Sequence, residues 1–454
     1  MITTDAKTLA AACGGEIIAG DPLQMAETVS TDTRSLRPSA CWVALKGDRF
    51  DANAFAAQAA AAGATVLVVE NLQGEVPAGT TVIQVGDGLL ALQKMAFWHR
   101  SRLSVEVVGI TGSNGKTSTK DFTRAVLGAH FPTFATQGNL NNHIGVPLTL
   151  LSLDASHRMA VVEMGMNHPG EIAPLCEMAR PRVGIITNIG TAHIEFLGSR
   201  EGIAEEKGAL ARSLDAEGAL FVPAGCDFIE YFRQRTKARV IPVGNCRGLI
   251  RADHLRQDGI RSQFTLVIEG REVGEVVLPV IGRHMVKNAL LAAGCGWFLG
   301  VPEVAICRGL SEAVLTSGRL RRFESQGVTV FDDTYNANPE SMTAAIETLA
   351  DVPVTAGGRR FVVLGRMGEL GEHAAEAHPR VGRLAAERGL GVIAVGEGAE
   401  GIAEGAGSDA HFSDAREAAV ALSGRFHPGD VVLFKASRGA ALERVMNEIF
   451  PPDN

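Results

Sequence analysis

The chain lacks the cysteine patterns that mark secreted or zinc-stabilised proteins. Its 454 residues include seven cysteines, an odd number, and no two of them form a C-x-x-C pair. Scattered cysteines argue against a disulfide framework or a zinc ribbon, and they fit a reducing compartment. The seven are Cys13, Cys41, Cys176, Cys226, Cys246, Cys295 and Cys307.

Targeting and membrane-spanning patterns are missing as well. The N-terminal sequence MITTDAKTLAAACGG has no basic segment followed by an apolar core, so we expect no signal peptide. The longest apolar stretch, ALLAAGCGWFLGV (289–301), is much shorter than a membrane span. We therefore expect a cytoplasmic protein without membrane insertion.

The chain also lacks the excess of basic residues that is typical of nucleic-acid-binding proteins. It has 43 Lys and Arg against 51 Asp and Glu, which gives a formal net charge of −8 at pH 7. A chain of this charge has no general electrostatic reason to bind nucleic acid, and we expect no such partner. An anionic ligand must instead be held by a local site.

Three regions differ in their hydrophobic pattern, as expected for a chain too long for one ordinary core. Residues 1–86 mix short strand-like runs with one alanine-rich helix. Residues 87–313 alternate continuous apolar strands with helices, which predicts a parallel α/β sheet. Within that region, residues 261–280 predict an antiparallel hairpin added to the sheet. Residues 314–454 form a second α/β alternation, so the predicted fold class is α/β in three domains.

A glycine-rich turn, GITGSNGKTSTKD (109–121), joins an apolar strand to a helical pattern. Free N–H groups at a helix start attract phosphate, glycines let the backbone approach it, and a lysine adds charge. The strict G-x-x-x-x-G-K-[ST] pattern fails because Ile110 stands at its first glycine. A turn of this kind is often only a turn, but the Gly-Lys-Thr ending favours a phosphate site. Its candidate residues are Thr111, Gly112, Ser113, Asn114, Gly115, Lys116, Thr117 and Ser118.

Two polar side chains follow other predicted strands of the same region. Glu163 comes after RMAVV, and His193 follows VGIITNIG. Since ligands in open α/β sheets lie beyond the carboxyl ends of the strands, both would face the phosphate crevice. A carboxylate suits Mg²⁺ better than a histidine does. Glu163 could instead start a helix, and the residues alone leave His193 open between a metal role and a hydrogen-bonded loop residue.

The loop TGSNGKT resembles the variant phosphate loop of the Mur ligase family, which are ATP-dependent amide-bond ligases. Further similar motifs, among them GNLNNHIGVPLTLL, GRHMVKNALLAAG, DDTYNANPESM and FKASRGAALE, extend the resemblance over nearly the whole chain. The resemblance implies ATP and Mg²⁺, with Lys116 at the phosphates and Thr117, Glu163 and His193 holding metal. It also implies a catalytic role for Lys207, which is carbamylated in several members. On its own, Lys207 reads as one charge on a solvated helix face.

The resemblance further implies that ATP lies between the second and third regions. Asn288 would contact the nucleotide, Arg319 the phosphates and Asp333 the ribose, while Tyr335 would stack on the base. Two of these residues have an ordinary alternative: Asn288 would be a packed helix residue, and the carboxylate pair ending the strand at Asp333 would be a common turn.

Other positions are assigned to the remaining substrates by the same resemblance. The sequence STDTR resembles the pattern of a UDP-binding domain and supplies Ser30, Asp32 and Arg34. Thr136 and Asn139 would face the phosphates and the sugar-peptide substrate. The side chains at the end of the last strand that would bind a dipeptide carboxylate are Lys435, Ser437 and Arg438. The alternative is that they are ordinary surface residues. An acidic residue is commoner in the family where Arg366 stands here.

Within the family, the motifs are similar to those of the members that add D-Ala-D-Ala to UDP-MurNAc-tripeptide. These two molecules are therefore the implied substrates, and we expect a monomer. The alternative in the same class is a ligase that adds the third residue, lysine or diaminopimelate, although the D-N-P-[RA] motif of the diaminopimelate enzymes does not occur. A nucleotide-dependent switch protein is the alternative in a different class.

Overall fold

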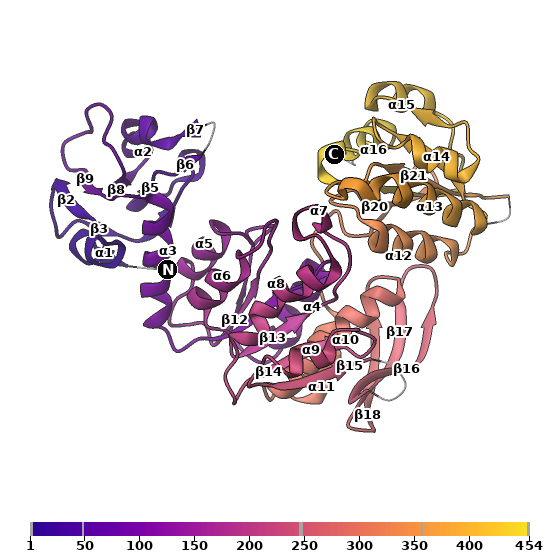
Figure 1. Ribbon diagram of the computed structural model, residues 1–454, viewed down its shortest axis with the longest axis horizontal. Coiled ribbons are helices and arrows are strands. Elements are labelled where there is room, and N and C mark those ends of the chain that lie inside the picture. Colours follow the sequence, from indigo (N-terminus) through magenta and orange to yellow (C-terminus); the bar gives the residue numbers. More distant parts are fainter. Residues whose placement is uncertain (1–2, 48–49, 245–247, 356, 452–454) are drawn as a thin grey trace.

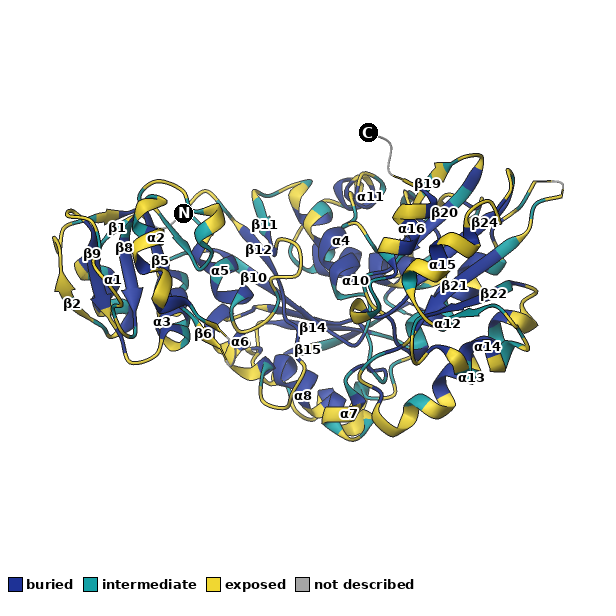
Figure 2. Cartoon of the chain, turned by 90° about the horizontal axis from the view of Figure 1, so that it is seen from above, coloured by how far each residue is buried: buried dark blue, intermediate teal, exposed yellow. Residues whose placement is uncertain are grey.

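A computed structural model describes residues 3–47, 50–244, 248–355 and 357–451. The chain forms three α/β units arranged along an elongated molecule, with the N-terminal unit at one end and the C-terminal unit at the other (Figure 1). Buried residues follow the strands of each unit (Figure 2). The α/β class is as predicted, and each large sheet falls within one predicted region, while the boundaries at 86/87 and 313/314 stay predictions.

The N-terminal unit is built on a five-stranded sheet in the order β2-β9-β8-β5-β4, in which only β2 is antiparallel to its neighbour. Its strands are β2 (Glu16–Ala19), β9 (Thr81–Gln84), β8 (Ala64–Val69), β5 (Ala40–Val43) and β4 (Thr28–Ser30). Its helices are α1 (Ala6–Cys13) and α2 (Ala56–Ala61), and α3 (Gly88–Ser101) packs on α1 and on the next unit. Short pairings add β1 (Thr4–Asp5), β3 (Met25–Ala26), β6 (Lys46–Gly47) and β7 (Phe50–Asp51).

The central unit is a fully parallel six-stranded sheet in the order β11-β12-β10-β13-β14-β15. The strands are β11 (Thr133–Ala135), β12 (Met159–Glu163), β10 (Glu106–Thr111), β13 (Val183–Ile186), β14 (Ala219–Pro223) and β15 (Arg239–Val243). The helices are α4 (Lys116–Gly128), α5 (Gly145–Leu151), α6 (Ile172–Ala179), α7 (Ile194–Leu197), α8 (Arg200–Arg212), α9 (Ile229–Arg233), α10 (Arg283–Phe298) and α11 (Glu303–Ser311).

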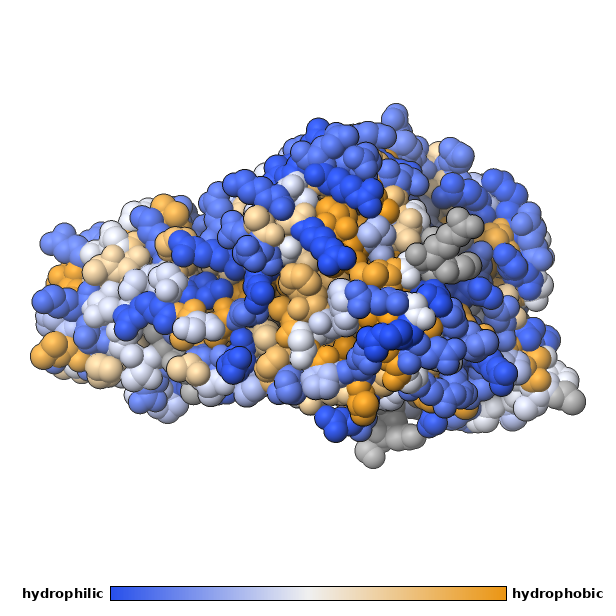
Figure 3. Space-filling model, turned by 90° about the horizontal axis from the view of Figure 1, so that it is seen from below, coloured by the Kyte–Doolittle hydropathy of each residue, from blue (hydrophilic) through white to orange (hydrophobic). Residues whose placement is uncertain are grey.

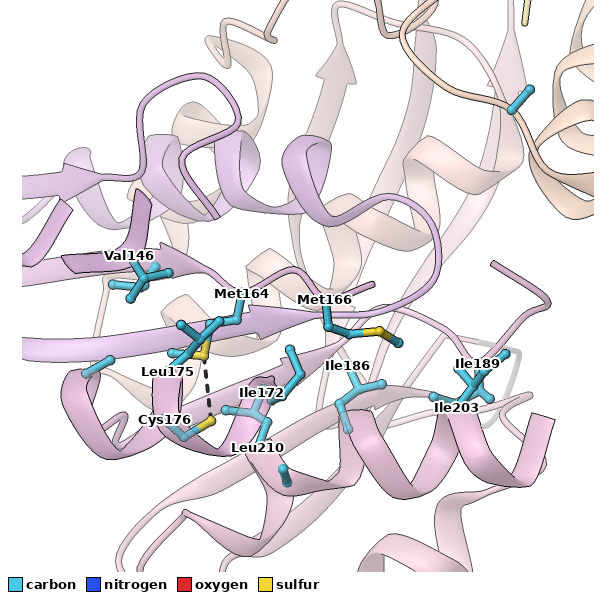
Figure 4. Close-up of a cluster of buried hydrophobic side chains, with 14 of the residues drawn as sticks. Val146, Met164, Met166, Ile172, Leu175, Cys176, Ile186, Ile189, Ile203 and Leu210 are labelled. Carbon is cyan, nitrogen blue, oxygen red and sulfur yellow. Dashed lines mark hydrogen bonds between the residues drawn. The ribbon is translucent and has the colours of Figure 1, made fainter. Parts of the chain in front are cut away.

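Helices cover both faces of this central sheet, which explains why the inner positions of its strands are apolar on both faces. Val107 of β10 belongs to the hydrophobic cluster on one face, and its neighbour Val108 belongs to the cluster on the other. On the first face, the sulfur atoms of Met164 and Cys176 lie 3.6 Å apart beside Leu210 of α8 (Figure 4). The sheet is thereby fixed between two packed layers.

The predicted hairpin is present, but the expectation that it joins the parallel sheet is wrong. It forms a separate antiparallel sheet of β16 (Ile250–Gln257), β17 (Ser262–Ile268) and β18 (Arg271–Leu278). The physical reason is its apolar face: Phe264 and Val276 are buried in one cluster with Leu290 of α10. The hairpin therefore packs face-on against helices and does not pair with an edge strand.

The C-terminal unit is a six-stranded sheet in the order β19-β20-β24-β21-β22-β23, antiparallel only between β19 and β20. Its strands are β19 (Arg321–Ser325), β20 (Val328–Asp333), β24 (Val431–Lys435), β21 (Arg360–Gly365), β22 (Gly391–Val395) and β23 (His411–Phe412). Its helices are α12 (Pro339–Ala350), α13 (Ala374–Glu387), α14 (Glu400–Ala406), α15 (Ala415–Leu422) and α16 (Glu443–Ile449).

The surface carries scattered apolar side chains from all three units, such as Phe50, Val304 and Val420. Seen from below, apolar residues are interspersed among hydrophilic ones over the middle of the molecule (Figure 3). Such single exposures are normal for a water-facing surface. Among the described residues, no helix has the length and apolar character needed to cross a bilayer.

The close packing of α13 on α14 predicts a strong effect of one added methyl group. A Cβ at Gly382 would lie 1.9 Å from the carbonyl oxygen of Ile402. We expect Gly382→Ala to lower the free energy of unfolding of the C-terminal unit by about 1–3 kcal/mol, measured by urea unfolding. Gly128→Ala is the control, since a Cβ there meets no atom within 4 Å. Equal unfolding midpoints for the two variants would contradict this packing.

Candidate functional site

A cavity of about 540 Å³ lies where the carboxyl ends of the central strands meet the C-terminal unit. Most residues predicted from the sequence line it. Those in the lining are Ser113, Asn114, Gly115, Lys116, Thr117, Ser118, Glu163, His193, Asn288, Arg319, Asp333, Tyr335 and Lys435. Those outside the described lining are Ser30, Asp32, Arg34, Thr111, Gly112, Thr136, Asn139, Lys207 and Arg438.

The glycine-rich loop runs from the end of β10 to the start of α4 and is shaped by two glycines with positive φ. A Cβ at Gly112 (φ 146°) would lie 1.9 Å from Thr187 Oγ1. A Cβ at Gly115 (φ 75°) would lie 2.8 Å from the amide nitrogen of Asn288. Only glycine fits both positions. The loop therefore turns tightly enough to direct the free N–H groups of the α4 N-terminus into the cavity.

Lys116 folds back over this loop. Its Nζ donates a hydrogen bond to the carbonyl oxygen of Gly112 at 2.9 Å. Burial lowers the pKa of Lys116, and the negative charge of Glu163 opposes that change. The ammonium group and the helix start together form a positive cradle for an anion.

Glu163, the last residue of β12, is held in place by three neighbours. Its Oε1 accepts hydrogen bonds from Asn141 Nδ2 at 2.8 Å and Thr117 Oγ1 at 3.3 Å. Its backbone N–H donates to Thr136 Oγ1 at 3.0 Å. Its Oε2 is buried without a hydrogen-bond partner among the described residues. An oriented carboxylate with a free oxygen beside a threonine hydroxyl fits Mg²⁺, which prefers oxygen ligands.

Thr136 and Asn139 lie outside the lining of this cavity, and their substrate roles stay predictions. Thr136 supports Glu163 from behind the cavity, and Asn139 is exposed. Asn141, two residues further, enters the lining and orients the carboxylate. The only signal for Asn141 was the run of Asn and Gly residues, which does not show which asparagine faces inward.

His193 has a left-handed backbone (φ 65°), and its Nδ1 lies 2.6 Å from Oε2 of Glu369 in the C-terminal unit. This contact with His193 lowers the pKa of Glu369. Sequence reasoning missed Glu369, which lies three residues after Arg366. The described part of the chain has no cluster of three or more His, Cys, Asp or Glu side chains suited to a metal. A cation here would therefore need oxygens from its substrate or from water.

The interpretation of Lys207 as a solvated helix charge is wrong. The residue lies on the inner face of α8 with only 1% of its surface exposed. Burial lowers the pKa of Lys207 well below its ordinary value, the charge of Lys116 lowers it further, and Glu206 opposes the change. Across the described ranges, Lys207 takes part in no ion pair. Burial of this kind favours the neutral form of an amine.

The C-terminal unit supplies the other wall of the cavity. Arg319 Nη2 donates to Thr117 Oγ1 at 3.1 Å, and its guanidinium lies 4.0 Å from the centre of the Tyr335 ring. Asp333 Oδ2 is 2.5 Å from Lys435 Nζ. The surface-charge alternative is therefore wrong for Lys435, which is 2% exposed and also donates to the carbonyl oxygen of Asn336.

With the exception of Lys435, the residues assigned to the other substrates lie outside the cavity lining. Arg34 pairs with Asp32 on the N-terminal unit and lowers the pKa of that carboxyl to about 2. Arg438 is exposed and lies 3.5 Å from Glu443, while the Ser437 hydroxyl donates to a backbone carbonyl. Their substrate roles stay predictions.

Comparison with known proteins identifies the family of the chain. It matches the Mur ligase middle domain over residues 110–296 and the Mur ligase, glutamate ligase domain over residues 318–438. The chain belongs to the Mur ligase family. Its relatives include the UDP-N-acetylmuramoyl-tripeptide–D-alanyl-D-alanine ligases of Escherichia coli strain K12 (37% identical over 93% of each chain) and Bacillus subtilis strain 168 (36% identical over 93% of this chain and 92% of the relative).

Solved structures of this Mur ligase type share the whole fold. MurF from Acinetobacter baumannii has a TM-score of 0.88 and 33% identity, with 99% of each chain covered. MurF ligase from Thermotoga maritima, solved in complex with ADP, has a TM-score of 0.81 and 29% identity, with 93% of this chain and 97% of that chain covered.

His284, in the first turn of α10, gives the cavity wall a pH dependence. Burial lowers the pKa of His284 to about 4, partly opposed by Asp333 and assisted by Lys435. The unfolded chain, with a histidine pKa near 6.5, binds more protons between these values. Stability that is present above pH 6.5 is therefore lost as pH falls toward 4.

We expect His284→Gln to remove up to about 1.4 kcal/mol of this dependence per pH unit, the limit for one proton. The measurement is the free energy of unfolding in urea at several values between pH 4 and 7.5. His130→Gln, at an exposed position, is the control. The same pH slope in His284→Gln as in the unmodified chain would refute the assignment.

Proposed function

We propose that this Mur ligase joins D-Ala-D-Ala to UDP-MurNAc-tripeptide in an ATP-dependent reaction. The observation that carries the proposal is the match to relatives named for this activity over 93% of the chain. The reaction would be the last peptide addition to the peptidoglycan precursor before it reaches the membrane. ATP use is supported by the phosphate loop and by the ADP complex of the Thermotoga maritima neighbour.

The chemistry requires one carboxylate to be activated and one amine to attack it. The terminal carboxylate of the tripeptide attacks the γ-phosphorus, which gives an acyl phosphate and ADP. The dipeptide amine, after losing a proton, then displaces phosphate and forms the amide. Lys116, Arg319 and the N–H groups at the start of α4 would stabilise the negative charge that develops on the transferred group.

Mg²⁺ is proposed as the cofactor because Glu163 has an unsatisfied buried oxygen beside Thr117. When bound, the metal would neutralise phosphate charge. Thr117 and Glu163 would hold it, with His193 as the further candidate, and Asn141 would fix the carboxylate.

Closure of the C-terminal unit would enclose the nucleotide and exclude water. Asp333 would bind the ribose, and Tyr335 would stack on the base with the face that Arg319 does not cover. Asn288 would lie beside the phosphate loop, where its amide packs against Gly115. Phosphate-loop residues Thr111, Gly112, Ser113, Asn114 and Ser118 complete the proposed ATP site.

The remaining substrates are assigned to residues of all three units. Ser30, Asp32 and Arg34 would bind the UDP part, and Thr136 and Asn139 would lie toward the sugar-peptide. Lys435 and Arg438 are the candidates for the dipeptide carboxylate, although Lys435 is paired with Asp333. A cytoplasmic monomer without a nucleic-acid partner is proposed with this function, in keeping with the acidic net charge.

The deciding experiment is phosphate release from ATP and Mg²⁺ with UDP-MurNAc-tripeptide, with and without D-Ala-D-Ala. We expect release that depends on the dipeptide and a pentapeptide product identified by mass. Lys116→Met should lose about 100-fold or more in rate because a transition-state cation is removed. Release that instead requires lysine or diaminopimelate with the shorter precursor would replace this function. Nucleotide binding without any acceptor dependence would favour a switch protein.

Carbamylation of Lys207 is proposed because burial lowers the pKa of its amine and so favours the neutral form, which is the form that reacts with CO₂. The modification would place an anion behind the phosphates. We expect one carbamate signal in carbon-13 NMR of the protein supplied with labelled bicarbonate, and loss of that signal in Lys207→Met. If the protein supplied with labelled bicarbonate shows no carbamate signal and is still fully active, the free amine of Lys207 is sufficient.

A further inference from the structure

A buried ion pair behind the phosphate loop has no part in the chemistry described so far. Lys120 and Asp121 follow Thr117 on α4, and their side chains are only 4% and 6% exposed. Lys120 Nζ lies 3.1 Å from Asp121 Oδ1. Neither side chain lines the described cavity. Removing two charges from water is costly, so a pair retained at this depth calls for a specific role.

The pair holds the segment that connects the central and C-terminal units. This connecting segment, residues 312–320, runs from the end of α11 to the start of β19. The backbone N–H of Thr316 donates to Asp121 Oδ2 at 2.8 Å. Lys120 Nζ, besides pairing with Asp121, donates to the carbonyl oxygen of Thr136 at 3.0 Å. One carboxylate oxygen of Asp121 is thereby held by Lys120, while the other binds the backbone of the connecting segment.

The same connecting segment carries Arg319, which reaches the phosphate loop. Arg319 Nη2 donates to Thr117 Oγ1, one helical turn before Asp121. Residues four apart lie on one face of a helix. The connecting segment is therefore attached to a single face of α4 at two points, Thr316 on Asp121 and Arg319 on Thr117.

We propose that Asp121, oriented by Lys120, is a positioning residue that fixes the connecting segment so that Arg319 is directed at the ATP phosphates. The inference rests on the proposed function only in assigning Arg319 to the nucleotide. Thr136 also joins this network to Glu163, since its carbonyl accepts from Lys120 and its hydroxyl accepts from the Glu163 N–H. Placement of the arginine and of the carboxylate thus depends on one buried pair.

The test compares nucleotide affinity among variants of the full chain by titration calorimetry with a non-hydrolysable ATP analogue and Mg²⁺. Asp121→Ala should bind about tenfold more weakly, the factor expected for loss of one charge-assisted contact. Asp121→Asn should recover most of the affinity, because the amide oxygen can still accept from Thr316. In turnover, the KM for ATP should rise more than kcat falls.

A double-mutant cycle separates positioning from general stability. If Asp121 acts through Arg319, then Arg319→Ala and the double variant Arg319→Ala/Asp121→Ala should have equal affinity. Asp430→Ala is the matched control, because Asp430 is 2% exposed and also anchors backbone N–H groups, those of Arg359 and His427, within the C-terminal unit. It should lower stability and leave nucleotide affinity unchanged.

Proteolysis gives a second measurement that needs no ligand. Release of the connecting segment in Asp121→Ala should accelerate tryptic cleavage after Arg319 relative to the unmodified chain and Asp430→Ala. Additive affinity losses in the cycle, or an affinity loss in Asp430→Ala equal to that in Asp121→Ala, would overturn the proposal. Nucleotide binding without dipeptide-dependent phosphate release would overturn the proposed ligase and leave this coupling standing.

Discussion

The site depends on one steric constraint, the close approach of the phosphate loop to its neighbours at Gly112 and Gly115. Because neither position has room for a Cβ, the loop turns sharply enough to start α4 at Lys116. The start of α4 then determines where the side chains of the helix lie. Thr117, one position after Lys116, forms hydrogen bonds with Glu163 and Arg319. Asp121, one helical turn further along α4, accepts a hydrogen bond from the connecting segment. A shifted helix start would misplace all of these contacts together.

Three polar contacts complete the closed arrangement of the central and C-terminal units. Asn338 Nδ2 donates to Asn114 Oδ1 at 2.6 Å, while its own Oδ1 caps α12. Glu340 accepts from the backbone and hydroxyl of Thr191, both at 3.0 Å. With the contact between His193 and Glu369, each joins a strand-end loop to the opposite unit. Polar contacts of this kind are exchangeable with water, which suits an interface that must open for substrate.

The strands, the phosphate loop and the position of Glu163 could be predicted from the sequence because each depends on a pattern of neighbouring residues. The solvated position predicted for Lys207 overlooked a local pattern, since the residue lies four residues after Ile203 and three before Leu210, on the buried face of α8. Asn141 and Glu369 were not readable from their neighbours. Their roles come from partners far along the chain, as with Glu369 and His193, and no local pattern determines which polar side chains of separate loops will meet.

Three lysines lie around the phosphate site, two of them buried (Lys120 and Lys207) and one half-buried (Lys116), and each has a different environment for its side-chain nitrogen. Lys120 has a permanent partner in Asp121, so its charge is balanced without any ligand. Lys116 rests on a carbonyl oxygen at the cavity, where incoming phosphate would supply the missing negative charge. Lys207 has no ion-pair partner among the described residues, and burial favours its neutral form. Since an unpaired buried charge is costly, the three lysines differ by their partners: Lys120 is paired within the protein, whereas the partners proposed for Lys116 and Lys207 are a phosphate group and CO₂.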